Sequence, residues 1–133
     1  MAIKVLIIDN DYDFIEACKN FLEAAGYEVA YEQQESEVIV QLERVRPQII
    51  LLDLVMDTTQ SGLIIAEKIN ASPTLRLIPI IFLTGYFTGA GLPEKEKEIV
   101  AKWANVRKVL DKPVKPQVLL EALQKALQPA TVN

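Results

Sequence analysis

The sequence contains no histidine, and this absence excludes several kinds of chemistry. Without an imidazole the chain cannot form a Ser-His triad, bind a metal through histidine, or carry a phosphohistidine. Any imidazole chemistry must therefore be supplied by another molecule.

Cysteine is almost as scarce, because Cys18 is the only one. An internal disulfide is impossible, so a reducing compartment fits and we expect a cytoplasmic protein. Cys18 falls at helical spacing with Phe14, Phe21 and Leu22, and this spacing predicts a core position.

Long apolar runs and basic clusters are also missing. After Lys4 the apolar stretch runs only from Val5 to Ile8, which is too short for a signal peptide or a membrane span. The formal net charge is -4, from 14 Lys and Arg against 18 Asp and Glu. We therefore expect neither nucleic acid nor a membrane surface as a direct partner.

The 133 residues suit a single domain, in which short β-rich runs alternate with helical stripes five times. This alternation predicts an α/β fold, a doubly wound five-stranded parallel sheet with five helices on its two faces. We expect the domain to cover residues 1–128 and a flexible tail to follow at 129–133. The predicted strands are Ile3–Ile8, Tyr27–Tyr31, Ile49–Leu52, Ile78–Leu83 and Val106–Leu110. The predicted helices follow an Asp11 cap, span Glu35–Val45 and Gly62–Asn70, and begin at Pro93 and Pro116.

Polar residues follow four of the predicted strands, and in a parallel sheet these strand ends share one edge. They are Asp9, Asn10, Asp53, Thr84 and Lys112. The run Ile49–Leu52 is apolar throughout and leads directly into Asp53, which predicts a strand buried on both faces.

Crowded carboxylates repel one another, and a divalent cation relieves that repulsion. Oxygen ligands suit Mg²⁺, Lys112 adds a compact positive charge, and Thr84 adds a hydroxyl donor. Together they predict a phosphoryl site with Asp53 as nucleophile. Taken singly, each residue has a structural alternative: a helix cap for Asp9 or Asp11, a loop role for Asp53 or Thr84, and simple exposure for Lys112.

The chain resembles a response-regulator receiver domain of two-component signalling, of the chemotaxis-regulator type. Four motifs in the same order and approximate spacing support the resemblance over residues 3 to about 128. They are Val5–Asp9, Pro47–Leu54, Ile80–Gly85 and Leu110–Pro113. The resemblance implies a flavodoxin-like sheet with strand order 2-1-3-4-5.

The resemblance also implies roles for individual residues. Asp53 matches the phosphoacceptor, Asp9 and Asn10 match the acidic pair that holds Mg²⁺, and Val55 matches the position whose backbone carbonyl completes the metal shell. Thr84 and Lys112 match the residues that contact the phosphoryl group, and the bond from Lys112 to Pro113 matches one that is typically cis.

The implied function is that of a stand-alone signalling phosphoacceptor, which catalyses only its own phosphorylation and dephosphorylation. Its donor is expected to be a sensor histidine kinase, a histidine phosphotransfer protein or a small acyl phosphate. Its output is a changed surface read by a downstream protein, or onward transfer in a phosphorelay.

Two single-residue departures from the family pattern carry expectations. The second acidic residue of the pair is Asn10, which is uncharged, so we expect weaker Mg²⁺ binding. Val109 stands where an aromatic switch residue is usual, and valine cannot make the large ring rotation.

Other departures concern hydrolysis and loop length. Val55 and Tyr86 occupy positions that tune loss of the phosphoryl group, and neither readily orients a water, so we expect slow loss. The segment 57–62 is one residue longer than usual, and the segment between Thr84 and Lys112 is several residues longer. The long loop Tyr86–Pro93 is either a partner-binding loop or a tolerated insertion.

Two other interpretations stay open at this point. In the first, Asn10 and Val109 mark a receiver-fold interaction module that acts without phosphorylation. In the second, Asp9-Asn10-Asp11 is the nucleophile motif of a haloacid-dehalogenase-type phosphatase. Against the phosphatase, Asp13 stands where Thr or Val is expected, and no acidic pair follows Lys112.

Overall fold

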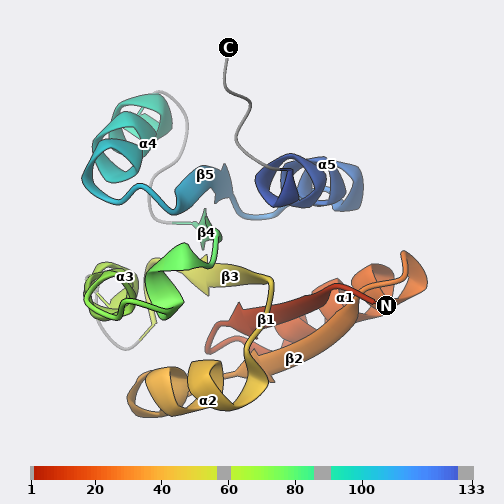
Figure 1. Cartoon of the computed structure of the whole chain (residues 1–133). Helices are drawn as coiled ribbons and strands as arrows, with labels where there is room; N and C mark the ends of the chain where they lie inside the picture. Colours follow the sequence, from red (N-terminus) through yellow and green to blue (C-terminus); the bar gives the residue numbers. More distant parts are fainter. Residues whose placement is uncertain (1, 57–60, 86–90, 129–133) are drawn as a thin grey trace.

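The fold is a five-stranded parallel sheet flanked by helices, as the sequence predicts (Figure 1). A computed structural model describes residues 2–56, 61–85 and 91–128. Within these residues the strand order is β2-β1-β3-β4-β5, which confirms the flavodoxin-like order. The strands are β1 (Lys4–Ile8), β2 (Glu28–Glu32), β3 (Ile49–Asp53), β4 (Ile80–Thr84) and β5 (Val106–Asp111).

Helices cover both faces of the sheet. In Figure 1, α2, α3 and α4 lie on one side of the sheet, and α1 and α5 lie on the other. Two short 3-10 turns, η1 and η2, precede α2 and β4. The bounds are α1 (Tyr12–Ala24), η1 (Glu35–Glu37), α2 (Val38–Val45), α3 (Ser61–Asn70), η2 (Leu75–Leu77), α4 (Gly91–Lys102) and α5 (Pro116–Leu127).

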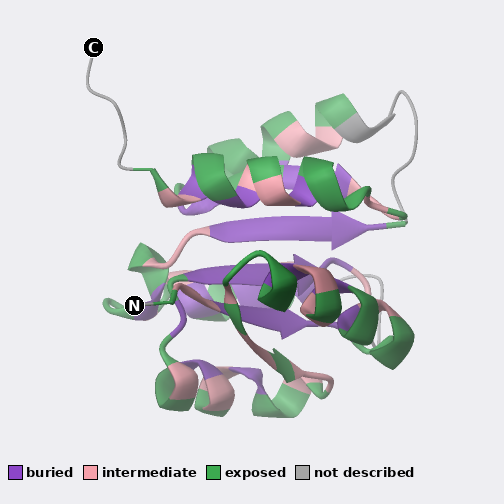
Figure 2. Cartoon of the chain, turned by 90° about the vertical axis from the view of Figure 1, so that its right-hand side faces the viewer, coloured by how far each residue is buried: buried purple, intermediate pink, exposed green. Residues whose placement is uncertain are grey.

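The core consists of two apolar layers, one on each face of the sheet. Side chains alternate across a strand, so Leu6 and Ile8 of β1 face α2, α3 and α4, whereas Val5 and Ile7 face α1 and α5. Every residue of β3 is buried, as the apolar run before Asp53 predicts. Figure 2 shows the central strands of the sheet buried along most of their length and the helices exposed on their outer sides, whereas the edge strand β2 is only partly buried.

Four strands, β2 to β5, end one residue later than the sequence pattern predicts, and for β3 and β4 the added residue belongs to the candidate site. β3 includes Asp53 and β4 includes Thr84, so these polar residues are the last residues of their strands rather than the first residues beyond them. β4 in turn begins later than expected, at Ile80. The reason is that the N–H of Ile78 donates to the carbonyl of Leu75 and closes η2.

The starts of α1 and α5 agree with the sequence prediction, whereas those of α2, α3 and α4 differ from it by one to three residues. Asp11 caps α1, and its carboxylate accepts the backbone N–H groups of Asp13 and Phe14. Residues Glu35–Glu37 form η1 rather than the start of α2. Helix α4 begins at Gly91, so Pro93 is its third residue and not its first. This position is tolerated because the first four N–H groups of a helix lack an intrahelical partner.

Three predicted features lie outside the described residues. They are most of the long segment 57–62, the first part of the loop Tyr86–Pro93, and the tail 129–133. In the part of the chain that is described, no helix combines the length and the apolar character needed to cross a membrane.

Gly62 lets the start of α3 approach the end of β3. Its N–H donates to the carbonyl of Leu54 at 2.9 Å. A Cβ atom at this position would lie 2.5 Å from the carbonyl oxygen of Asp53 and 2.5 Å from the Cα atom of Leu54. Both contacts are with backbone, so no side-chain rotation relieves them, and the backbone that carries Asp53 must move.

We therefore expect Gly62→Ala to lower the free energy of unfolding by about 2–3 kcal/mol, the usual cost of forcing extra atoms into a packed site. Urea denaturation measures this change. Gly85→Ala is the control, because a Cβ there meets nothing within 4 Å. Equal stability of the two variants would contradict the importance of this close approach.

Candidate functional site

The last residue of β3 is a buried acid. Asp53 is only 6% exposed, although its carboxylate is a strongly hydrated group. One carboxylate oxygen, Oδ1, accepts the backbone N–H of Val55 at 3.1 Å. This bond orients the side chain toward the carboxyl edge of the sheet, where β1, β3 and β4 end.

A second buried acid lies beside it. Asp9 directly follows β1, which pairs with β3, and it is 1% exposed. Its Oδ1 accepts the backbone N–H of Asp11 at 2.9 Å, which fixes the turn from β1 into α1. The strand pairing therefore brings two carboxylates together that are 44 positions apart in the sequence.

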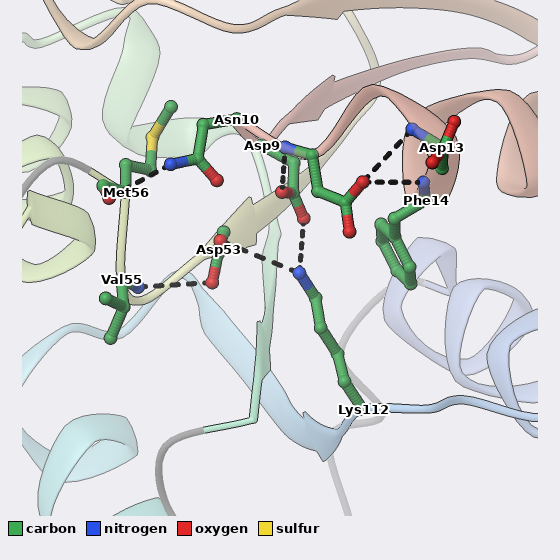
Figure 3. A network of polar contacts seen from close by, with 9 residues as sticks. Asp9, Asn10, Asp13, Phe14, Asp53, Val55, Met56 and Lys112 are labelled. Atoms are coloured by element: carbon green, nitrogen blue, oxygen red, sulfur yellow. Dashed lines mark hydrogen bonds and ion pairs between the residues drawn. The ribbon is translucent and has the colours of Figure 1, made fainter.

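Lys112 bridges the two acids from the other side (Figure 3). Its Nζ lies 2.5 Å from Oδ2 of Asp9 and 3.6 Å from Oδ2 of Asp53. Its side chain is 20% exposed. Nζ also lies 4.2 Å from the centroid of the Phe14 ring, a cation–π contact that the sequence does not predict.

Burial, together with the neighbouring charges at this edge, raises the pKa of Asp53 from 3.8 to about 6. Burial is the largest cause, because it disfavours the charged form, and repulsion from Asp9 adds to it. The positive charge of Lys112 and the Val55 N–H oppose the rise without cancelling it. The two acids are thus incompletely compensated by the single lysine.

Asn10 and Asp11, which follow Asp9 in the sequence, each make a hydrogen bond outside the buried pair of acids. The side-chain amide of Asn10 donates to the backbone carbonyl of Met56 at 3.0 Å, and its oxygen is directed toward the side of the two carboxylates (Figure 3). Asp11 is exposed and caps α1, so it does not join Asp9 and Asp53 as a third acid. Among the described residues, no group of three or more acidic, cysteine or histidine side chains is placed to hold a metal.

The remaining oxygen donors nevertheless fit Mg²⁺. Asp9 and Asp53 supply two carboxylates whose mutual repulsion raises a pKa, and a divalent cation would relieve that repulsion. Asn10 supplies an amide oxygen and Val55 a backbone carbonyl. Such a set of hard oxygen ligands, partly open to water, is the kind of site Mg²⁺ uses in proteins.

Thr84 and Lys112 are brought together by the pairing of β4 and β5. The carbonyl of Thr84 accepts the backbone N–H of Lys112 at 2.9 Å, and Thr84 is completely buried. The peptide bond from Lys112 to Pro113 is cis, as the family resemblance predicts. The five strand-end residues thus lie at one edge of the sheet, and Asp9, Asp53 and Lys112 are in direct ionic contact.

Val109 occupies the position of the usual aromatic switch and is packed in the core at 1% exposure. Its backbone N–H donates to the carboxylate of Glu96 on α4 at 2.8 Å. Glu96 also lies 3.6 Å from the ammonium of Lys108. The sequence did not point to this link between α4 and β5, because a surface glutamate carries no signal of its partner.

Cys18 is buried, as its helical spacing predicts. Burial raises the pKa of its thiol to about 12, and the negative charge of Asp9 contributes to the rise. The thiolate is therefore suppressed at neutral pH, which supports a packing role.

A doubly wound parallel sheet with two buried acids and a lysine at its carboxyl edge defines the class of receiver-like α/β proteins. The sequence model of the response regulator receiver domain matches residues 5–124. This chain therefore belongs to the response regulator receiver domain family of two-component signalling. Membership of this family, together with the capping role of Asp11, disfavours the phosphatase interpretation.

Solved structures agree with this assignment. The chemotaxis response regulator CheY4 of Vibrio cholerae is 26% identical, with a TM-score of 0.79 over 95% of this chain and 99% of that one. A CheY-like receiver domain protein from Methanospirillum hungatei is 24% identical, with a TM-score of 0.75 over 96% and 94%. The BeF3-activated receiver domain of Klebsiella pneumoniae RstA is 17% identical, with a TM-score of 0.78 over 95% and 99%. No curated protein sequence matches the chain.

The raised pKa of Asp53 predicts how stability depends on pH when no divalent cation is bound. A group whose pKa is higher in the folded than in the unfolded protein favours folding while protonated, and this advantage disappears as pH rises through the folded pKa. Stability should therefore fall progressively as pH rises from about 4 to 6, and the loss should persist at higher pH. One pKa unit corresponds to about 1.4 kcal/mol, which solvent screening reduces.

We expect Asp53→Asn to be more stable than the wild type by about 1–2 kcal/mol at pH 7.5 and equally stable at pH 4. Urea unfolding in EDTA at both pH values measures the difference. Glu43→Gln removes an exposed carboxylate of α2 and serves as the control. The same gain for Asp53→Asn at both pH values would show that ionisation is not its cause.

Proposed function

We propose that Asp53 accepts a phosphoryl group from a phosphohistidine on a sensor kinase or phosphotransfer protein, in a Mg²⁺-dependent step. The observation that carries the proposal is the contact of one ammonium, that of Lys112, with two buried carboxylates at the carboxyl edge of the sheet. The absence of histidine from the sequence requires the donor to be another molecule.

In the transfer step, a carboxylate oxygen of Asp53 attacks the phosphorus of the donor. The new O–P bond forms as the N–P bond of the phosphohistidine breaks, and the electron pair of that bond stays with the leaving imidazole. The imidazole then takes a proton from solvent. Little covalent assistance is needed, so positioning and charge neutralisation account for the rate.

Several residues around Asp53 contribute to this positioning and charge neutralisation. The Val55 N–H holds one oxygen of Asp53 at 3.1 Å and leaves the other directed toward Lys112. The ammonium of Lys112 is proposed to pair with a phosphoryl oxygen once the carboxylate of Asp53 has become an acyl phosphate. The hydroxyl of Thr84, at the end of the adjacent strand, is proposed to donate to a second phosphoryl oxygen.

Mg²⁺, held by Asp9, Asp53, the Asn10 amide oxygen and the Val55 carbonyl, would neutralise charge on the incoming phosphoryl oxygens. The negative charge of this ligand set comes from Asp9 and Asp53, because Asn10 is neutral. The phosphoryl group is expected to be lost slowly, because the aliphatic side chain of Val55 cannot orient a water molecule for attack.

The protein is proposed to act as a signalling phosphoacceptor whose altered surface is read by another protein, and not as an enzyme that turns over a substrate. A large aromatic rotation cannot transmit the change, because Val109 is a buried valine. The carbonyl of Thr84 accepts the backbone N–H of Lys112, the residue after β5, so one hydrogen bond joins the site to the end of β5.

A second candidate is a receiver-fold module that signals without phosphorylation. One observation favours it: the Asn10 side chain donates to the Met56 carbonyl, a bond that the usual carboxylate at this position cannot make. In this case the strand-end residues would serve mainly to stabilise the fold. The experiment below separates the two candidates.

Incubation with acetyl phosphate and Mg²⁺ should add one phosphoryl group to the wild type, detected by intact mass and mapped to Asp53. The adduct should persist after the donor is removed. Asp53→Asn should gain nothing, and Asp13→Asn, an exposed acid on α1, should react as the wild type does. An adduct that persists in Asp53→Asn would sink the assignment, and an unmodified wild type would favour the silent module.

Asn10→Asp should bind Mg²⁺ roughly tenfold more tightly than the wild type, a difference of about 1.4 kcal/mol, because it adds a negative charge beside Asp9 and Asp53. Isothermal titration calorimetry measures both affinities. Asn10→Ala removes the amide oxygen and should bind more weakly than either. Equal affinity in all three proteins would show that position 10 does not contribute to the metal site.

A further inference from the structure

We propose that Phe14 is a positioning residue for phosphoryl transfer, because the face of its ring holds the ammonium of Lys112 at the two carboxylates. The inference rests on the proposed function of Asp53. The ammonium lies 4.2 Å from the ring centroid, and the same nitrogen contacts Asp9 and Asp53 (Figure 3). The electron-rich face of an aromatic ring attracts a cation, most strongly where water is largely excluded.

Lys112 needs such support because its side chain is long and flexible. The carboxylates attract the ammonium unequally, since Nζ is 2.5 Å from Asp9 but 3.6 Å from Asp53. When Asp53 is phosphorylated, the ammonium is attracted by the phosphoryl group instead of by the Asp53 carboxylate. The ring provides an attraction that stays constant through the reaction and keeps the ammonium at the site.

The turn from β1 into α1 positions the backbone of Phe14 relative to Asp9. The carboxylate of Asp9 accepts the N–H of Asp11 at 2.9 Å, and the carboxylate of Asp11 accepts the N–H of Phe14 at 3.3 Å. One short segment, from Asp9 to Phe14, therefore places both a carboxylate and an aromatic face against the same ammonium.

A simple packing role accounts less well for this arrangement. Phe14 lies at the margin of the layer that α1 and α5 build with the sheet, and it is half-buried, whereas Ile15 and Leu22 on the same helix are completely buried. Phe21 is also half-buried against this layer, two helical turns further along α1. Phe21 thus offers a matched comparison, a phenylalanine on the same helix and in the same layer.

The test compares Phe14→Leu, Phe14→Tyr and Phe21→Leu with the wild type. Leucine keeps an apolar side chain but removes the ring face, and tyrosine restores it. We expect Phe14→Leu to slow modification of Asp53 by acetyl phosphate roughly three- to tenfold, the rate equivalent of one cation–π contact. Phe14→Tyr should restore the rate, and Phe21→Leu should leave it unchanged while losing comparable stability to urea.

A second measurement does not depend on phosphorylation. The side-chain ammonium of Lys112, assigned by its loss in Lys112→Arg, should give an NMR signal protected from solvent exchange in the wild type and in Phe14→Tyr. That protection should fall in Phe14→Leu. If the wild type is never phosphorylated, the proposed function fails and this signal alone decides the positioning role. A wild-type rate and signal in Phe14→Leu, or failure of tyrosine to restore them, would overturn the inference.

Discussion

The carboxyl edge of the sheet depends on one electrostatic arrangement, in which the ammonium of Lys112 holds two buried carboxylates that repel each other. Asp9 and Asp53 are 1% and 6% exposed, so neither is well screened by water. Burial, and after it repulsion from Asp9, raises the pKa of Asp53, and the one positive charge of Lys112 does not cancel this rise. The site is thus electrostatically incomplete by itself, which is the property expected of a place that receives a cation and a phosphoryl group.

The strand order explains why these groups meet. β1 and β3 are neighbours at the centre of the sheet, and the connections that follow them diverge, since α1 covers one face and α3 the other. Open α/β sheets bind ligands at such a point, outside the carboxyl ends of the strands. Gly62 contributes from the other side, because only a residue without a Cβ lets α3 begin directly against the backbone of Asp53 and Leu54.

Much of this arrangement was predictable from the sequence because it follows from periodicity. The alternation of strands and helices led to the sheet, and polar residues at four strand ends led to the common edge. Boundaries were less predictable where a hydrogen bond settled them, as when Ile78 closed η2 and so delayed β4. Contacts of side chains that belong to none of the recognised motifs were not predictable. Phe14 looked like one more apolar residue of α1, and Glu96 looked like a surface acid, because their partners lie on β5 or just beyond it.

The structure also gives a physical account of the two departures from the family pattern, Asn10 and Val109. An aspartate at position 10 could not donate a hydrogen bond to the Met56 carbonyl. Asn10 makes this bond, which links the β1–α1 turn to the segment after β3, but it lacks the negative charge that an aspartate would offer a metal ion. Val109 has no ring that could rotate. Its backbone N–H donates to Glu96 of α4, and its strand, β5, pairs with β4, the strand that ends in Thr84. Because Glu96 of α4 accepts the backbone N–H of Val109, and valine has no ring to rotate, we expect a change at Asp53 to reach the surface as a displacement of backbone elements. Under the proposed function the signal lies in the relative position of β5 and α4, and the displacement begins at the buried carboxylates and Lys112.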